Sequence, residues 1–181
     1  KIFISWSEQV PNSEAVRALA AAISGRPGFI VCGELPAEDG FAETLSALAA
    51  HLICPICAEP LSNLRFGSHD RSHLCVRYNR WLADQEFVEK YQPEWILRFG
   101  AFPVTRHLQS YISSNAIIHA LVEPWPRWTD PAHRLTHLLR AGPLAVCRAL
   151  LAEAPEPTPS GWHAAFVEKE ASVHFGNVAT H

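Results

Sequence analysis

Short runs of continuously apolar residues, separated by stretches with helical spacing, constrain the fold of this chain more than any other feature. The clearest runs are GFIVC at 28–32, EWILRFG at 94–100 and AIIHALVE at 116–123. A strand that is apolar at every position is buried on both faces, which is typical of a parallel sheet covered by helices on both sides. The sequence therefore predicts a protein of the α/β class.

Two further strands complete the predicted sheet. They are ICPICAE at 53–59 and a short fifth strand in RLTHLLR at 134–140. Helices are expected after a cap at Asn12 or Ser13 and ending at Gly25, from Phe41 to 52, over 75–91 with a break near Asp84, from Pro103 onward, and over about 143–153. Right-handed crossovers between such units give a doubly wound, mainly parallel, five- to six-stranded Rossmann-like sheet.

The proline-rich segment PEPTPSG at 155–161 is a break in composition. It divides the chain into a lead-in with the first helix (1–27), a Rossmann-like central domain (28–154), and a linker with a C-terminal amphipathic connector helix (155–181). The chain starts at Lys1 and contains no methionine. We therefore expect it to be a piece of a longer protein.

The overall composition indicates a globular protein and argues against several other classes of protein. The chain has 181 residues, of which 48% are hydrophobic and 18% charged, as expected for a globular domain rather than a disordered segment. Its net charge of -3 gives no general attraction to nucleic acid or to anionic membranes. No apolar run reaches the roughly 18 residues of a membrane span, and the first residues do not resemble a signal peptide. We expect a soluble, cytoplasmic protein.

The five cysteines have no regular spacing, and an odd number argues against a disulfide framework. Cys54 and Cys57 have the C-x-x-C spacing of redox and zinc sites. They lie in a strand-like run, however, where residues three apart point to opposite faces, and no second pair is present to complete four zinc ligands. We interpret them as small buried residues, with metal or redox chemistry as the alternative.

Ligands of doubly wound sheets bind outside the carboxyl ends of the strands. The segments expected there are GELPAEDG (33–40), AEPLSNLRFGSHDRS (58–72), AFPVTR (101–106) and PWPRWTD (124–130). The first of these lacks the G-x-G-x-x-G pattern of dinucleotide sites and carries a proline and acidic residues instead. Diphosphate binding is therefore not expected at this loop.

His69 and Asp70 are a candidate pair for a catalytic triad. Adjacent residues seldom meet in that geometry, and the sequence has no G-x-S-x-G nucleophile motif. We interpret the pair as part of a solvated loop in which Asp70 caps the next turn, and the triad is the alternative.

Arg106 and His107 are the candidate binding residues. They are expected in the first turn of the helix after the third strand, where free amides and a cation together form an anion site. The alternative is a surface arginine beside a half-exposed histidine. Trp125 and Trp128 are expected to form an aromatic cover at the end of the sheet.

Four segments carry a family resemblance. AEPLSNLRFGSHD, YNRWL, PEWILRFGAFPVTRHLQSYI and WPRWTDP come in an order and spacing that resemble the central domain of the SEPHCHC synthase family. These are thiamine-diphosphate-dependent enzymes of menaquinone biosynthesis. The resemblance covers roughly residues 28–140, and its specificity comes from PLS-x-LR combined with RFG-x-x-PV.

The resemblance implies an activity for the full-length protein. Family members decarboxylate 2-oxoglutarate and add the succinyl unit to isochorismate, which gives SEPHCHC. Their outer domains hold thiamine diphosphate and Mg²⁺ (or Mn²⁺), and the central domain has no cofactor of its own. The resemblance therefore implies a fragment that is inactive alone, with flanking domains as partners, within a homodimer or homotetramer. No catalytic, cofactor-binding or metal-binding residue is expected in this chain.

The resemblance also assigns roles to individual residues. A basic residue after the PVS segment of the family projects toward the substrate pocket, and Arg106 takes its place here, followed by His107. An arginine there can bind a carboxylate at two points. Arg65 is a candidate for the domain interface. Two alternatives remain open: a free-standing Rossmann-like ligand-binding module, and the middle domain of another thiamine enzyme, of the acetohydroxyacid synthase type.

Overall fold

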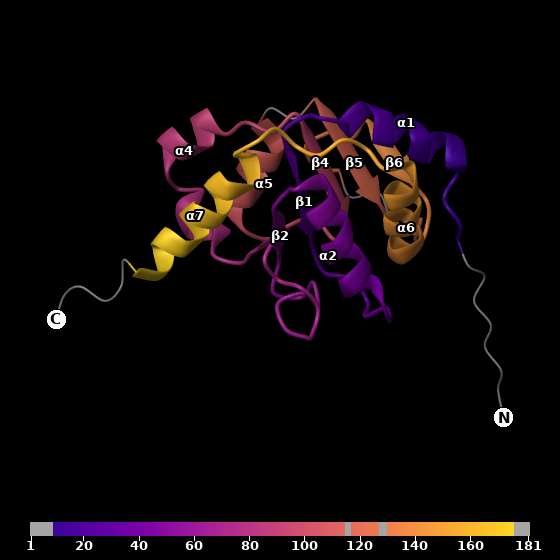
Figure 1. The fold of residues 1–181 in the computed structure, drawn as a ribbon, viewed down its shortest axis with the longest axis horizontal. Helices are drawn as coiled ribbons and strands as arrows, with labels where there is room; N and C mark the ends of the chain where they lie inside the picture. Colours follow the sequence, from indigo (N-terminus) through magenta and orange to yellow (C-terminus); the bar gives the residue numbers. More distant parts are fainter. Residues whose placement is uncertain (1–8, 115–116, 127–129, 176–181) are drawn as a thin grey trace.

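The computed structural model describes residues 9–114, 117–126 and 130–175. Within them the chain forms a six-stranded sheet in which all paired strands are parallel, in the order β3-β2-β1-β4-β5-β6 (Figure 1). The strands are β1 Gly28–Cys32, β2 Ile56–Ala58, β3 Leu74–Cys75, β4 Trp95–Phe99, β5 Ile118–Val122 and β6 His137–Leu139. The predicted α/β fold with a doubly wound parallel sheet is confirmed.

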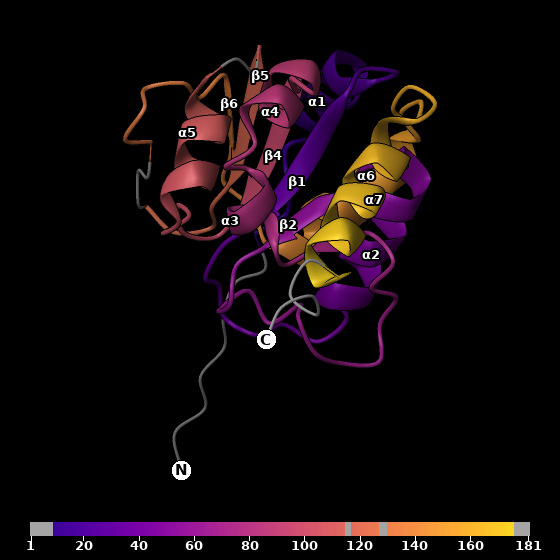
Figure 2. The same ribbon diagram turned by 90° about the vertical axis from the view of Figure 1, so that its left-hand side faces the viewer.

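Helices cover both faces of the sheet. One face carries α1 Ser13–Ile23, α2 Phe41–Leu52 and α6 Pro143–Glu153. The other carries α3 Tyr78–Trp81, α4 Gln85–Lys90, α5 Arg106–Ser114 and α7 Trp162–Phe175, and Figure 2 looks onto the side where these four lie. Every residue of β1, β4 and β5 is buried, as their mainly apolar pattern predicted, and this includes the polar Arg98 and His119. No helix in the described residues is both long and apolar enough to span a membrane.

The C-x-x-C pair illustrates how the strands divide the core. Cys54 belongs to the cluster under α1, α2 and α6, whereas Cys57 belongs to the cluster under α3, α5 and α7. Both thiols are free and fully buried, and burial raises the pKa of each above its usual value. The two side chains therefore lie on opposite faces of the sheet, as the spacing in a strand-like run predicted.

The stretch at 75–91, predicted to be one broken helix, is helical over only part of its length. The break is confirmed, because Asp84 caps α4 by accepting a hydrogen bond from the Phe87 amide at 3.3 Å. The start is wrong: Leu74 and Cys75 form the edge strand β3, and α3 begins only at Tyr78. Leu74 and Cys75 form a strand because they pair with β2, and a pairing partner distant in the chain cannot be recognised from the local sequence.

The chain beyond residue 155 packs onto the sheet domain. Thr158 bonds through its amide to the carbonyl of Leu52 at 2.8 Å, and through its hydroxyl to that of Ile53 at 2.6 Å. The Trp162 indole donates to the carbonyl of Gly28 at 2.8 Å. Helix α7 then places the fully buried Phe166 in the second core cluster. The predicted C-terminal helix is therefore present, and it covers the sheet.

A polar pair, Arg98 and His119, is fully buried between the sheet and the helices on its second face. The Arg98 Nε–H donates to His119 Nε2 at 3.0 Å, and the Arg98 guanidinium carbon lies 4.8 Å from the centroid of the Phe102 ring. Burial lowers the pKa of Arg98 to about 10, so it remains charged at neutral pH. Burial, followed by the charge of Arg98, lowers the pKa of His119 to about 4. His119 is therefore neutral in the folded protein at neutral pH.

We expect His119 to make the fold sensitive to acid. Its pKa is about 4 in the folded protein, against 6.5 for an unperturbed histidine, so between these values the unfolded chain binds more protons and stability falls as the pH drops. From pH 7 to pH 5 the wild type should lose about 2 kcal/mol more free energy of unfolding than His119→Gln. Urea denaturation of both proteins at both pH values measures this. Equal losses would contradict it.

Candidate functional site

The loops after β1, β2, β4 and β5 meet at the carboxyl edge of the sheet. The strand order reverses direction between β1 and β4, which are neighbours in the sheet although β2 and β3 intervene in the chain. In open α/β sheets such a switch point is where a ligand usually binds. The residues at this edge therefore decide what the domain can hold.

The switch point itself is closed by backbone contacts. The Gly33 amide donates to the carbonyl of Phe99 at 2.9 Å, and the Ala101 amide donates to that of Glu34, also at 2.9 Å. A Cβ atom on Gly33 would lie 2.0 Å from the Ala101 oxygen, and one on Gly100 would lie 2.4 Å from the Glu34 oxygen. These amides are thus bonded between the two loops and are not available to a diphosphate.

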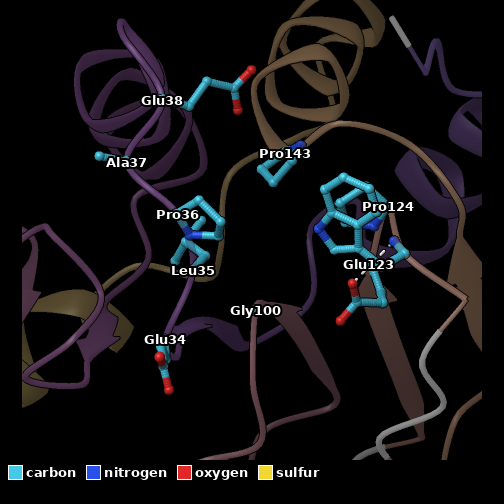
Figure 3. Close-up of a pocket in the computed structure, with 10 residues that line it drawn as sticks. Glu34, Leu35, Pro36, Ala37, Glu38, Gly100, Glu123, Pro124 and Pro143 are labelled. Carbon is cyan, nitrogen blue, oxygen red and sulfur yellow. Dashed lines mark hydrogen bonds between the residues drawn. The ribbon is translucent and has the colours of Figure 1, made fainter. Parts of the chain in front are cut away.

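A cavity of about 180 Å³ opens beside this contact (Figure 3). Its lining comes from the loops after β1, β4 and β5 and from the start of α6, and it combines prolines with three glutamates: Glu34, Leu35, Pro36, Ala37, Glu38, Gly100, Glu123, Pro124, Trp125 and Pro143. Carboxylates around the wall oppose the binding of phosphate or carboxylate groups. The cavity therefore does not fit a diphosphate-bearing cofactor.

Trp125 lines this cavity and is partly exposed, and its amide donates to Glu123 Oε1 at 3.1 Å. This places it at the sheet end where an aromatic cover was predicted. Trp128, the other half of that prediction, lies outside the described residues.

The long loop after β2 projects from the lower side of the molecule in Figure 1. His69 is buried, and its Nε2 bonds to the carbonyl of Leu64 at 2.9 Å. Asp70 instead accepts bonds from the Ser72 amide at 2.9 Å and the Ser72 hydroxyl at 3.0 Å, and these bonds lower the pKa of Asp70. Each residue bonds to a different part of the loop. The interpretation of Asp70 as a turn cap is therefore confirmed, but the expectation of a solvated loop is wrong for His69, which is buried.

Arg65 turns back toward its own strand. Its Nε and Nη2 both donate to the carbonyl of Ala58, at 3.0 and 2.8 Å. The guanidinium thus supports the base of the loop, and the predicted role of Arg65 at a domain interface stays a prediction.

Arg106 and His107 begin α5 at the carboxyl end of β4. Arg106 is exposed, and His107 is half-buried with Nδ1 3.0 Å from the Asn79 carbonyl and 3.2 Å from its Oδ1. A carbonyl oxygen only accepts, so His107 Nδ1 carries the hydrogen. The neutral ring therefore offers Nε2 as an acceptor, and the protonated ring offers it as a donor. The substrate-binding role of both residues stays a prediction.

A residue that the sequence did not single out organises the start of α5. The helix was expected from Pro103 but begins at Arg106, and the intervening residues form a loop bonded to Glu59. Glu59 Oε2 accepts from the Val104 amide at 3.4 Å, and Oε1 accepts from the Thr105 hydroxyl at 3.3 Å. The available signal was an acidic residue at the carboxyl end of a buried strand.

The residues of this edge do not fit metal binding either. In the described part of the chain, no group of three or more His, Cys, Asp and Glu side chains is arranged to hold a metal ion. Among the described residues, the carboxyl edge carries Arg106, His107 and Glu59 beside a cavity with three glutamates. A cation at the helix start can bind an anion, whereas the carboxylates of the cavity oppose one.

Comparison with known proteins adds independent information. No protein-family model matches the chain. The chain is 54% identical over 181 residues to the 2-succinyl-5-enolpyruvyl-6-hydroxy-3-cyclohexene-1-carboxylate (SEPHCHC) synthase of Dechloromonas aromatica (strain RCB), covering 100% of this chain and 34% of that protein. It is 36% identical over 160 residues to the synthase of Geobacillus kaustophilus, covering 87% of this chain and 28% of that protein.

A third relative extends this range. The synthase of Haloarcula marismortui is 34% identical over 175 residues, covering 93% of this chain and 29% of that protein. The chain thus spans about a third of the length of these relatives. A solved structure from Mycobacterium smegmatis, described as a thiamin diphosphate-dependent enzyme, has a similar fold with a TM-score of 0.50 at 14% identity, covering 87% of this chain and 30% of its own.

Proposed function

This chain is homologous to part of the SEPHCHC synthases, and we propose that it forms the central, mainly structural domain of such an enzyme. The full-length protein would decarboxylate 2-oxoglutarate and add the succinyl unit to isochorismate. The observation that carries the proposal is the match of the whole chain, at 54% identity, to about a third of one synthase. That match favours this function over a free-standing module or an acetohydroxyacid synthase domain.

The features of the carboxyl edge support different roles for the domains of the full-length protein. Thiamine diphosphate would be held by the other domains, because the switch point here is closed and the carboxylates of the adjacent cavity oppose a diphosphate. Mg²⁺ (or Mn²⁺) would be held there with it. When bound there, the cofactor supplies the carbanion chemistry of the reaction. The central domain would contact these flanking domains within a cytoplasmic homodimer or homotetramer, and would be inactive alone. In this proposal residues 28–154 form the sheet part of the central domain, and α1 and α7 pack against it.

Arg106 would be the substrate contact of this domain, assisted by His107. Its guanidinium is exposed at the start of a helix, where the positive end of the helix dipole also favours an anion. Both substrates carry carboxylates, which an arginine can bind at two points. His107 would add one hydrogen bond through Nε2 when its ring is protonated.

The test is Arg106→Ala in the full-length enzyme. We expect kcat/KM to fall roughly ten- to hundredfold for one carboxylate substrate, because a charge-assisted hydrogen bond contributes about 1.5–3 kcal/mol. The free energy of unfolding should change by about 0.5 kcal/mol or less, as for other surface positions. Steady-state kinetics with 2-oxoglutarate and isochorismate, measured beside urea denaturation, give both values.

Arg148→Ala is the matched control, because Arg148 is also an exposed arginine but lies on α6 at the opposite face. It should leave kcat/KM unchanged for both substrates. An unchanged kcat/KM in Arg106→Ala would remove Arg106 from the site. A large loss of stability in that variant would make the residue structural instead.

A further inference from the structure

The carboxylate of Glu59 joins three elements at the carboxyl edge. Only 4% of the residue is exposed, at the end of β2. Oε1 accepts from the Tyr78 hydroxyl of α3 at 2.6 Å and from the Thr105 hydroxyl at 3.3 Å, and Oε2 accepts from the Val104 amide at 3.4 Å. Burial and then the neighbouring carboxylate raise the pKa of Tyr78, so its hydroxyl keeps its proton and remains a donor.

Helix α3 holds the same loop from a second side. Tyr78 supports Glu59, and the next residue, Asn79, accepts the Nδ1–H of His107. One short helix therefore supports the segment on both sides of Arg106, through Glu59 before it and directly at His107 after it. The loop before Arg106 is bonded to Glu59, and the residue after it is bonded to Asn79.

Helix α3 is itself fixed by α7. The buried carboxylate of Glu170 accepts from the amides of Val76 and Arg77 at 2.9 and 2.8 Å, and from the Trp81 indole at 2.7 Å. These bonds hold both ends of a helix that is only one turn long. The start of α5 is thus supported by hydrogen bonds that pass from α7 through α3 to Glu59.

We propose that Glu59, held by Tyr78, is a positioning residue that fixes the start of α5 so that Arg106 can bind the substrate carboxylate. The proposal rests on the function proposed above for Arg106. A carboxylate suits this role because it accepts several donors at once, and its negative charge is favourable beside a helix N-terminus. Glu59 acts through Arg106 and does not itself touch the substrate.

Two substitutions in the full-length enzyme test the role. Glu59→Gln keeps the size of the side chain but replaces one acceptor oxygen by a donor, and Tyr78→Phe removes only the hydroxyl that holds the carboxylate. Both should lower kcat/KM by on the order of ten- to hundredfold for the substrate affected by Arg106→Ala, the loss expected for displacement of a binding group by about 1 Å. Tyr78→Phe keeps the test valid if Glu59→Gln fails to fold.

Tyr111→Phe is the matched control. Tyr111 is a second buried tyrosine, on α5 itself, and its hydroxyl donates to the carbonyl of Tyr91, away from Glu59. It should reduce stability as Tyr78→Phe does, because each loses a buried hydroxyl bond, yet leave kcat/KM unchanged. An equal loss of kcat/KM in both variants would mean that Tyr78 acts only on stability, which would overturn the proposal.

The double variant Tyr78→Phe/Arg106→Ala separates positioning from a purely structural effect. If Tyr78 and Glu59 act through Arg106, adding Tyr78→Phe to Arg106→Ala should lower kcat/KM by less than twofold further. If Tyr78→Phe instead lowers kcat/KM as much in the Arg106→Ala background as in the wild type, the positioning role is overturned while the function of Arg106 stands. If Arg106→Ala alone changes neither substrate's kcat/KM, the proposed function of Arg106 fails first, and the role of Glu59 falls with it.

Discussion

Replacing Phe166 by alanine should lower the free energy of unfolding of this chain by about 3–5 kcal/mol. Phe166 is fully buried on α7, and its ring lies 5.0 Å from that of Trp162, 5.3 Å from Phe87 and 5.6 Å from Trp81, measured between centroids. The edge-to-face contacts with Phe87 and Trp81 add to the cost of the cavity that alanine would leave. Urea denaturation followed by tryptophan fluorescence measures the change.

Val167→Ala is the control for Phe166→Ala. Val167 is the next residue of α7 and is 39% exposed, so its truncation should cost about 0.5 kcal/mol or less. If Phe166→Ala were equally mild, α7 would not be part of the folded domain. The contrast between the two therefore tests whether the chain beyond residue 155 belongs to the core.

Gly100→Ala should be nearly as damaging, with an expected loss of about 2–5 kcal/mol. Gly100 has φ +74°, a left-handed conformation that costs other residues roughly 1–2 kcal/mol. The added Cβ would also lie 2.4 Å from the Glu34 carbonyl oxygen, and backbone atoms cannot yield as a flexible side chain does. The substitution would force apart the loops after β1 and β4.

Gly161→Ala isolates the conformational part of this cost. Gly161 has φ +86°, but no atom lies within 4 Å of where its Cβ would be. Its replacement should therefore cost only the roughly 1–2 kcal/mol of the left-handed conformation. Thermal denaturation of the two variants side by side measures the difference. Equal losses would show that the two loops can separate without a penalty.

The sequence by itself determined the α/β class and the main parallel strands, although it missed the edge strand β3. β1 was predicted at its observed bounds, and α6 at 143–153, because each has a local signal strong enough to stand alone. For β1 the signal is a continuous apolar run between glycines, and for α6 it is a proline in the first turn. The cap of α1 at Asn12 is of the same kind, since the side chain bonds to an amide three residues away at 3.0 Å.

The family resemblance also came from the sequence, because motif order and spacing are properties of the chain itself. Relatives at 34–54% identity then bore it out, although the structural match has only 14% identity. The location of Arg106 and His107 at the start of a helix after a strand followed from local pattern as well. Their proposed contact with substrate depends on atoms of other domains, which no local pattern can supply.

The tertiary structure alone decided which distant residues support this edge. Glu59 and Val104 are 45 residues apart, and Glu170 is 89 residues from Trp81 of the helix that it holds. A carboxylate in a sequence has the same appearance whether it will face water or accept buried hydrogen bonds. The two outcomes differ only in which donors the fold brings within about 3 Å of it, because a buried polar group must find its partners across the whole structure.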